Sequence, residues 1–153
     1  MNKFMLRALV EIPLGSMYKY EVDKNTNKLV VDRPLPSPIT YNYGYIPNTL
    51  HNDGDPTDVC IVGDTPIYPL TSVNVYVVGA FRCIDNGSVD DKLVAVVLGD
   101  NMPEFKIELG KKKIEHYLST YKKGFIVKGF VDADQAAVII NRDWERFGAS
   151  HGL

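Results

Sequence analysis

The sequence has few cysteines, no excess of basic residues and no long hydrophobic run. Its two cysteines, Cys60 and Cys83, both stand in apolar segments, so we expect buried thiols and not a disulfide or a metal-binding pair. The formal net charge of -2 argues against a general nucleic-acid or membrane-surface binder, because such proteins carry a basic surface. No apolar run reaches membrane-spanning length, and Arg7 and Glu11 interrupt the N-terminal run before it could serve as a signal peptide. We therefore expect a cytoplasmic protein.

The length and the apolar content bound the size of the fold. With 153 residues, of which 45% are hydrophobic, the chain can bury one core, and we expect a single domain over residues 1–153. We find no internal repeat and no low-complexity tract; short alternating segments are separated by turn residues. This spacing favours a β-rich domain.

Alternation of apolar and polar residues predicts strands along the first two thirds of the chain. Residues 4–12 and 17–23 alternate in this way, and residues 29–33 form the returning strand of a hairpin after a polar turn. This hairpin would bring Lys19 close to Arg33. Further strands are expected over residues 59–62, 73–84 and 93–98, with a turn at 85–88 between the last two.

Helical spacing in the last third predicts a first helix that packs on the sheet or barrel. Ile114, Tyr117 and Leu118 recur at intervals of three and four residues, which places them on one helix face. Lys122 then falls at the end of this helix. A strand is expected to follow over residues 125–131.

A second helix is expected to close the sequence. Asp132 with Gln135 three residues later resembles a capping box, which marks the start of a helix. Gly148 is a candidate C-terminal stop, because glycine readily takes the left-handed conformation found there. The expected core contacts of this helix are Ala136, Ile139, Ile140, Trp144 and Phe147.

The most informative segment of the chain is Asp-Gly-Asp-Pro-Thr-Asp at residues 53–58, directly before the apolar run 59–62. Carboxylates crowded this closely repel one another, and hard divalent ions such as magnesium relieve the repulsion because they take oxygen ligands. Asp53, Asp55 and Asp58 are therefore candidates for a divalent-metal site.

Two other kinds of acidic loop resemble this segment less closely. An EF-hand calcium loop needs glycine at its sixth position and glutamate at its twelfth, where this chain has Asp58 and Asp64. Haloacid-dehalogenase-type phosphatases carry aspartate-x-aspartate-x-threonine, which matches residues 53–57. Their apolar strand precedes the signature, however, whereas here it follows.

A second acidic group stands at the tip of the second predicted hairpin, with Asp85, Asp90 and Asp91 as its members. The strands on both sides could bring this tip and the segment 53–58 to one end of a barrel. Glu11 and Glu21, each on the polar face of its strand, could extend the same basin. The sequence therefore predicts that carboxylates far apart in the chain gather at one place.

Residues 53–59 resemble the signature of the soluble family I inorganic pyrophosphatases, which is aspartate-glycine-aspartate-proline-x-aspartate followed by an aliphatic residue. Other segments match further motifs of that family in the family's order, which makes the resemblance much more specific than one short string. These segments are Glu11-Ile12-Pro13, Lys19-Tyr20-Glu21, Asp32-Arg33, Asn42-Tyr43-Gly44-Tyr45, Asp85 with Asp90-x-Lys92, and Tyr121-Lys122.

The resemblance implies a mainly β fold with α-helices, namely a five-stranded, OB-like closed β-barrel elaborated by two α-helices. It implies hydrolysis of inorganic pyrophosphate to two orthophosphates by direct attack of a metal-bound hydroxide. Several Mg²⁺ ions would serve each active site, with Mn²⁺ or Zn²⁺ as substitutes. A homo-oligomer is implied, with a hexamer favoured, and no nucleic-acid or membrane partner. The alternatives are a haloacid-dehalogenase-type phosphatase and a non-catalytic OB-type binding module.

The resemblance also implies a role for each matching residue. Asp55 would be the general base, and Glu21 would support the metal ligands from behind. The metal ligands would be Glu11, Asp53, Asp58, Asp85 and Asp90. The substrate-binding residues would be Lys19 and Tyr43 at the phosphate under attack, Arg33, Tyr121 and Lys122 at the departing phosphate, and Lys92 as a further cation.

These residue types suit the reaction independently of the resemblance. Pyrophosphate carries several negative charges, so an attacking hydroxide is repelled unless cations neutralise both partners. Two close metal ions lower the pKa of a shared water and hold the attacking and leaving oxygens. Arg33 can bind two phosphate oxygens at once, whereas the lysines act as point charges and the tyrosines donate hydroxyl hydrogen bonds.

Overall fold

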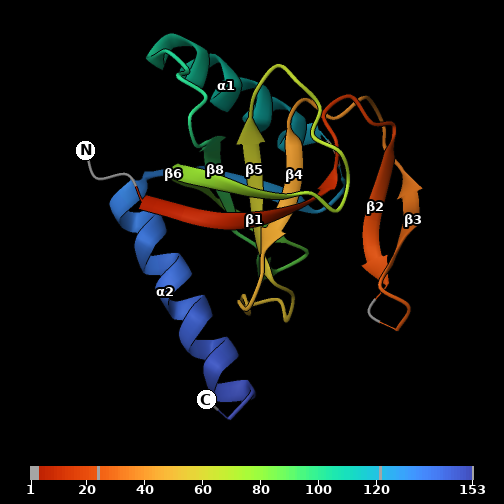
Figure 1. Cartoon of the computed structure of the whole chain (residues 1–153), viewed down its shortest axis with the longest axis vertical. Coiled ribbons are helices and arrows are strands. Elements are labelled where there is room, and N and C mark those ends of the chain that lie inside the picture. The colour runs from red at the N-terminus through yellow and green to blue at the C-terminus, as the bar shows by residue number, and fades with distance from the viewer. Residues whose placement is uncertain (1–3, 24, 121, 153) are drawn as a thin grey trace.

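The computed structural model describes residues 4–23, 25–120 and 122–152. Most of this part of the chain is in strands, and two long helices fall in its last third (Figure 1). The elements in chain order are β1 Phe4–Ile12, β2 Tyr18–Asp23, β3 Lys28–Pro34, β4 Asn42–Ile46, β5 Thr57–Val62, β6 Ser72–Asp85, β7 Ser88–Val89, β8 Lys92–Val97, α1 Glu104–Thr120, β9 Phe125–Asp132 and α2 Ala133–Ser150.

Five strands form a closed barrel, as expected. They are hydrogen-bonded in the order β1, β4, β5, β8 and β6, and β6 also pairs with β1, which closes the ring. The pairing of β5 with β8 is parallel and the other pairs of the ring are antiparallel. Closure leaves these strands with no free edge, so their backbone groups are satisfied within the barrel.

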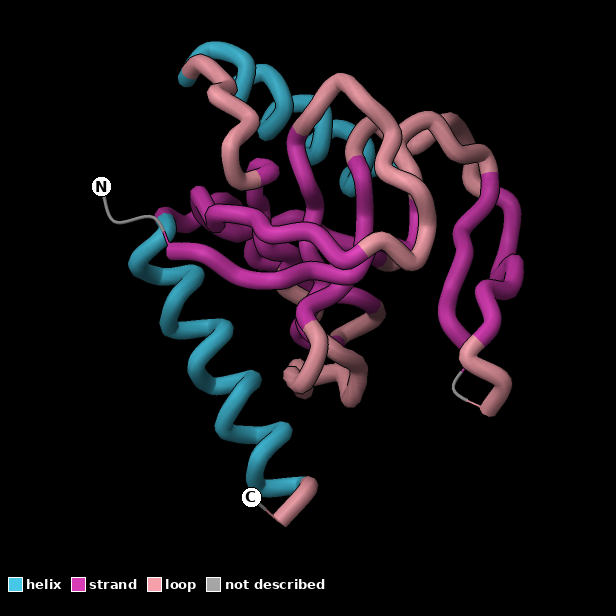
Figure 2. The backbone as a smooth tube through the Cα atoms, viewed as in Figure 1, coloured by secondary structure: helices cyan, strands magenta, loops and turns pink. Residues whose placement is uncertain are grey.

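The other strands extend this barrel. The long strand β6 continues beyond it and pairs with β7 and β9. Strands β2 and β3 form a separate two-stranded hairpin that stands beside the barrel (Figure 2). Lys19 and Arg33 are cross-strand partners in this hairpin, as its predicted register required.

Each helix packs on a different apolar cluster, because successive residues of a strand point to opposite faces. Val59 of β5 belongs to the cluster that also contains Ala136 and Ile140 of α2. Its neighbour Cys60 belongs to the cluster that contains Ile114 of α1. Strand β5 is therefore buried on both faces.

The sequence-based expectations for the cysteines and for both helices hold in most respects. Cys60 and Cys83 are free, buried thiols. Asp132 is the N-cap of α2, and its carboxylate accepts a hydrogen bond from the backbone N–H of Gln135 at 3.0 Å. The helix α1 occupies the predicted segment and begins at Glu104.

Two local expectations were wrong, and one strand was not predicted. Trp144 was expected in the core but is 41% exposed, because it lies on the outer face of α2. Gly148 does not end this helix, which continues to Ser150 and has His151 as its C-cap. Strand β4 was not predicted; it contains Asn42 and Gly44, residue types that are uncommon in strands.

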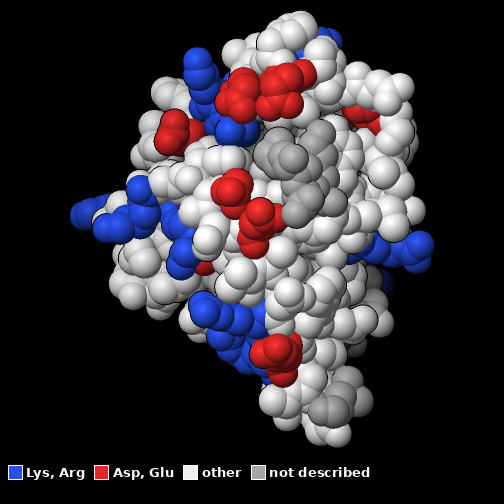
Figure 3. All heavy atoms as spheres, turned by 90° about the vertical axis from the view of Figure 1, so that its left-hand side faces the viewer, with Lys and Arg blue, Asp and Glu red and all other residues white. Residues whose placement is uncertain are grey.

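Charge is distributed without a dominant sign on the face drawn in Figure 3. Basic and acidic side chains are interspersed there among uncharged surface, and in places they lie side by side. Within the described residues, neither α1 nor α2 has the combined length and hydropathy that a membrane-spanning helix needs.

Candidate active site

A cavity of about 460 Å³ opens between one end of the barrel and the β2–β3 hairpin. Most of the residues that the sequence analysis selected line this cavity, although they come from distant segments. They are Glu11, Lys19, Glu21, Tyr43, Asp53, Asp55, Asp58, Asp85, Asp90, Lys92 and Lys122.

Two residues predicted to bind substrate are missing from this list for different reasons. Arg33 is not among the side chains that line the cavity; it lies opposite Lys19 on β3, and its charge acts on the phenol of Tyr117. Tyr121 lies outside the described residues.

Asp53, Asp58 and Asp90 form the centre of the site. Each offers one carboxylate oxygen, and these oxygens lie within 4.8 Å of one another. The parallel pairing of β5 with β8 brings them together, since Asp58 is the register partner of Lys92 and Asp90 precedes Lys92 by two residues. Such a group of hard oxygen donors is the ligand set that Mg²⁺ or Ca²⁺ prefers.

Asp90 provides a direct test of whether a cation fits. Its side chain is buried, and its Oδ1 atom has no hydrogen-bond partner among the described residues. A buried carboxylate oxygen without a donor is costly in free energy, so such an atom favours a bound water molecule or cation. The donor set therefore fits a divalent cation.

Lys92 lies between two of these carboxylates. Its Nζ is 2.7 Å from Asp58 Oδ2 and 3.0 Å from Asp90 Oδ2, and it donates to the Tyr43 hydroxyl at 2.6 Å. The Lys92 side chain is only 3% exposed. Burial raises the pKa of Asp58, and the Lys92 ammonium offsets only part of this effect. One ammonium thus compensates only part of the negative charge.

Glu11 adds a further carboxylate on the side of β1. Its Oε2 accepts a hydrogen bond from the backbone N–H of Val22 at 3.2 Å. The pKa of Glu11 is raised from 4.5 to about 7, mainly by burial and to a smaller extent by the nearby charge of Asp58. Burial likewise raises the pKa of Asp53. The basin therefore favours protons, or other cations, near its carboxylates.

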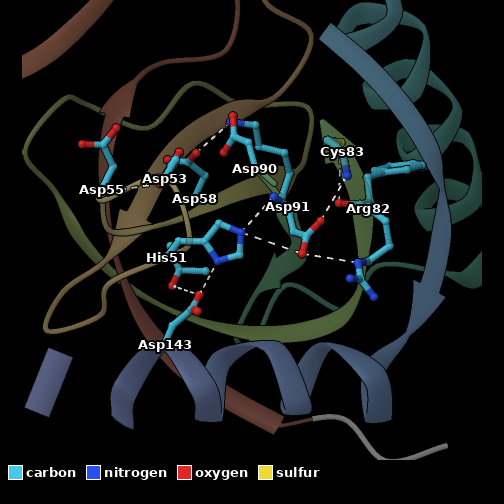
Figure 4. Close-up of polar contacts among 12 residues, drawn as sticks. His51, Asp53, Asp55, Asp58, Arg82, Cys83, Asp90, Asp91 and Asp143 are labelled. Atoms are coloured by element: carbon cyan, nitrogen blue, oxygen red, sulfur yellow. Dashed lines mark hydrogen bonds and ion pairs between the residues drawn. The ribbon is translucent and has the colours of Figure 1, made fainter. Parts of the chain in front are cut away.

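Asp55 is exposed to solvent, as Asp53 is, and it also lines the cavity. Its backbone N–H donates to Asp53 Oδ1 at 3.1 Å, and its carbonyl accepts from the backbone N–H of His51 at 2.7 Å. Gly54 has a φ of 89°, a conformation that favours glycine, and this allows the tight turn. Figure 4 shows the Asp55 carboxylate set apart from those of Asp53 and Asp58.

Basic side chains form the opposite rim of the cavity and are only loosely held. Lys19 Nζ is 3.2 Å from Asp32 Oδ2, and Lys122 Nζ is 2.8 Å from Asp85 Oδ2. Both pairs are partly exposed, and exposed ion pairs contribute little free energy. These lysines can therefore exchange their partners for an anion. Glu21 is exposed at the same rim.

The sequence analysis missed one part of this region. His51 is buried and contacts Asp143 of α2, a residue 92 positions away, directly behind the carboxylates (Figure 4). The position of His51 two residues before Asp53 was its only local signal, and nothing near Asp143 indicated a polar role.

Comparisons with known proteins show which family and which fold this chain resembles. Residues 8–148 match the family model described as inorganic pyrophosphatase. The inorganic pyrophosphatase of Halalkalibacterium halodurans is 39% identical, over 94% of this chain and 95% of its own length. That of Mycoplasma genitalium is 42% identical, over 86% and 78%. The crystal structure of inorganic pyrophosphatase from Thermus thermophilus matches with a TM-score of 0.84 at 31% identity, over 94% of this chain and 91% of that chain.

Proposed function

Since the chain belongs to the family of inorganic pyrophosphatases and hydrolyses inorganic pyrophosphate to two orthophosphates, we propose that the carboxylate cluster is its metal centre. Asp53, Asp58 and Asp90 would hold a divalent cation, and Glu11 and Asp85 would serve cations that arrive with the substrate. The observation that carries this assignment is the convergence of three carboxylate oxygens within 4.8 Å, one of them on the buried Asp90.

Magnesium is the metal that we propose. The family is metal-dependent, and the cluster offers only carboxylate oxygens among the described residues. Mg²⁺ prefers such ligands, whereas Zn²⁺ favours histidine and cysteine, so Mn²⁺ is expected to replace Mg²⁺ better than Zn²⁺ does. Divalent cations held there lower the pKa of a coordinated water and offset the negative charge of pyrophosphate.

Asp55 is the proposed general base. It lines the cavity beside the cluster. Within the described residues, no lysine or arginine forms an ion pair with its solvent-exposed carboxylate, as Lys92 does with Asp58 and Asp90. A carboxylate in this position can accept a proton from water while the water attacks phosphorus. Hydrolysis then proceeds without a covalent intermediate on the protein.

The basic rim is proposed to bind the two phosphates. Lys19 and Tyr43 would hold the phosphate under attack, and Lys122 would hold the departing one together with Arg33 and Tyr121. The weak ion pairs of Lys19 and Lys122 support this assignment, because the lysines can leave these pairs for phosphate oxygens. Lys92 already contacts three protein oxygens, so its charge would act on the substrate from behind Tyr43. Glu21 would support the ligands from the hairpin.

The proposal is tested by measuring phosphate release from pyrophosphate. The parent protein is assayed with Mg²⁺ and with excess chelator, beside Asp55→Asn and the matched control Asp64→Asn, which changes an exposed aspartate outside the cavity. We expect release only with Mg²⁺, a fall in kcat of about 10²- to 10⁴-fold for Asp55→Asn, and an unchanged rate for the control. Full activity of Asp55→Asn would remove the general-base assignment.

We also propose a cytoplasmic homo-oligomer, with a hexamer expected. The family resemblance supports this, as do the exposed apolar side chains Phe105 and Leu109 on α1. Light scattering of the purified protein at working concentration tests it. A mass equal to that of one 17.1 kDa chain would contradict the proposal.

A further inference from the structure

A buried polar cluster lies directly behind the carboxylate site (Figure 4). His51 is 2% exposed, Asp91 is 3% exposed and Asp143 is 1% exposed. Buried polar groups are stable only when they are hydrogen-bonded, so a cluster of this size must be held by specific contacts. The contacts in this case run between the two loops that carry the proposed metal ligands.

The imidazole of His51 uses both ring nitrogens. Nδ1 is 2.7 Å from Asp143 Oδ2, and Nε2 is 3.0 Å from the backbone nitrogen of Asp91. A backbone N–H can only donate, so Nε2 must be the acceptor and carries no hydrogen. The hydrogen is then on Nδ1, which donates it to Asp143. The geometry therefore specifies a neutral imidazole in one tautomer.

The backbone of His51 shapes the acidic turn itself. Its N–H donates to the carbonyl of Asp55 at 2.7 Å, and its carbonyl accepts from the N–H of Gly54 at 3.0 Å. The same residue thus holds the turn that presents Asp53 and, through its ring, reaches the residue next to Asp90. This ring is a direct connection between the two ligand-bearing loops.

Helix α2 anchors the connection from behind. Asp143 Oδ2 also accepts from the Thr57 hydroxyl at 2.6 Å, immediately before Asp58. Its Oδ1 accepts from Arg146 Nη1 at 3.0 Å, and Arg146 donates as well to the carbonyl of Leu50 at 2.8 Å. Both carboxylate oxygens of Asp143 therefore accept hydrogen bonds. These bonds fix the segment 53–58 and the residues just before it relative to helix α2.

Asp91 is held from its far side as well. Its Oδ1 accepts from the backbone N–H of Cys83 at 3.1 Å, and its Oδ2 is 3.3 Å from Arg82 Nε. Both partners belong to β6, a strand of the barrel. The second loop is therefore fixed to the barrel at the point where the His51 ring meets it.

We propose that His51, oriented by Asp143, is a positioning residue that sets the distance between the Asp53–Asp58 loop and Asp90. This inference rests on the proposed assignment of these carboxylates as ligands of a divalent cation. Three carboxylates that repel one another tend to move apart, and a rigid connection behind them keeps their oxygens close before the cation arrives. The cation then binds without first drawing two loops together.

The experiment measures Mg²⁺ binding to the substrate-free protein by calorimetry at pH 8. Two variants separate the two ring contacts. In His51→Asn the side-chain amide can replace Nδ1 as the donor to Asp143 but cannot reach Asp91. In His51→Gln the side-chain carbonyl can replace Nε2 as the acceptor for the Asp91 N–H. Ile140→Val is the control, because it shortens a buried side chain of the same helix that belongs to the apolar cluster.

We expect the Kd for Mg²⁺ to rise about 10- to 100-fold in His51→Asn, to rise less in His51→Gln, and to stay within about twofold of the parent in Ile140→Val. In the activity assay, the Mg²⁺ concentration for half-maximal rate should rise in His51→Asn while kcat at saturating Mg²⁺ recovers to within about threefold of the parent. A general loss of stability would not produce this separation.

The outcomes are distinguishable. A parent protein that binds no Mg²⁺ would refute the ligand assignment before any variant is measured. A parent that binds Mg²⁺, beside a folded His51→Asn with an unchanged Kd, would refute the positioning role alone. If His51→Asn does not fold, imidazole ¹⁵N chemical shifts of the parent at pH 8 decide instead. A hydrogen on Nδ1 alone supports the connection, and a hydrogen on Nε2 overturns it.

Discussion

Charged side chains of opposite sign lie close together in the site, in a region largely removed from water. Lys92 is almost fully buried between Asp58 and Asp90. Glu11 lies nearby, and its raised pKa favours the protonated carboxyl. Burying such groups costs free energy that their mutual attraction only partly offsets. A substitution at one of them therefore leaves the others without a charge partner. Two predictions follow from this balance.

Replacement of Lys92 by methionine should destabilise the metal-free protein most strongly at high pH. Removing one partner of a buried ion pair costs about 3 kcal/mol of unfolding free energy, because the remaining carboxylates are left uncompensated. At pH 5 the loss should be smaller, since burial raises the pKa of Asp58 and protonation then relieves the repulsion. Urea unfolding with chelator at pH 5 and pH 8 measures both losses.

The matched control for this prediction is Lys106→Met. Lys106 pairs with Asp64 at 3.5 Å, and both side chains are well exposed, so its loss should change the unfolding free energy by about 0.5 kcal/mol or less. Equal losses for Lys92→Met at the two pH values would contradict the expected protonation.

Glu11→Gln should flatten the pH dependence of stability in the metal-free protein. The folded-state pKa of Glu11 is about 7, above its ordinary value of 4.5. The folded protein therefore retains a proton that the unfolded chain loses, and the stability from this group, present below pH 4.5, is lost as the pH rises through 7. Because the side chain is partly exposed, we expect the loss in unfolding free energy from this group to be about 2 kcal/mol.

Glutamine cannot titrate, and its carbonyl can still accept the hydrogen bond from Val22. Urea unfolding with chelator at pH 5 and pH 8 should thus show a smaller decrease in stability for Glu11→Gln than for the parent. Parallel pH profiles of the two proteins would contradict the raised pKa.

Strands β4, β5 and β8 determine how the site is assembled. The parallel pairing of β5 with β8 aligns the ends of these strands, so that Asp58 and Asp90 meet although they are far apart in sequence. Strand β4 joins β5 to β1 and carries Tyr43 to the cavity. Its Gly44 is opposite Val10, at a place where β1 departs from regular register.

Gly44→Ala should disrupt this part of the barrel. A Cβ atom at position 44 would collide with the backbone carbonyl of Leu9, which cannot move without opening the β1–β4 pairing. We expect a loss of about 3 kcal/mol in unfolding free energy, at the upper end for overpacked positions. Gly63→Ala is the control, because a Cβ there meets no atom within 4 Å. Thermal unfolding that gives similar midpoints for both variants would be the contrary result.

In the whole molecule, the barrel and the β2–β3 hairpin together enclose an acidic basin with basic residues on its rim. Burial raises the pKa values of Glu11, Asp53 and Asp58, so protons and divalent cations compete for the same oxygens. Binding of a cation to the folded state alone stabilises the protein by mass action. Metal binding should therefore raise the unfolding free energy, and the size of this increase should depend on pH.

Mg²⁺ without substrate should raise the unfolding temperature more at pH 8 than at pH 6. At a concentration 100 times its Kd, the cation adds about 2.7 kcal/mol to the unfolding free energy, and at lower pH protons displace it. Calorimetric scans at both pH values, each with and without Mg²⁺, measure the shift. An excess of Na⁺ at equal ionic strength is the control, and a shift of the same size with Na⁺ would contradict specific binding.

Much of the fold follows from local patterns in the chain. The alternation in residues 4–12 and the capping pair at Asp132 and Gln135 predicted β1 and the start of α2, because strand period and helix capping depend on neighbouring residues. The order of short motifs around residues 53–58 likewise indicated the family and its fold, which the comparisons confirm. The site roles carried over from that family remain predictions.

Other features depended on contacts between distant segments. The parallel pairing of β5 with β8 has no local signature. Strand β4 alternates in burial, but two of its buried positions are Asn42 and Gly44, so hydrophobicity does not mark its inner face. The exposure of Trp144 depends on which face of α2 meets the barrel. The contact of His51 with Asp143 joins residues 92 positions apart. The chain alone specified which chemical groups and which local elements are present, because these depend on near neighbours. Their distances, burial and charge partners arose only when the barrel closed and brought remote loops to one end.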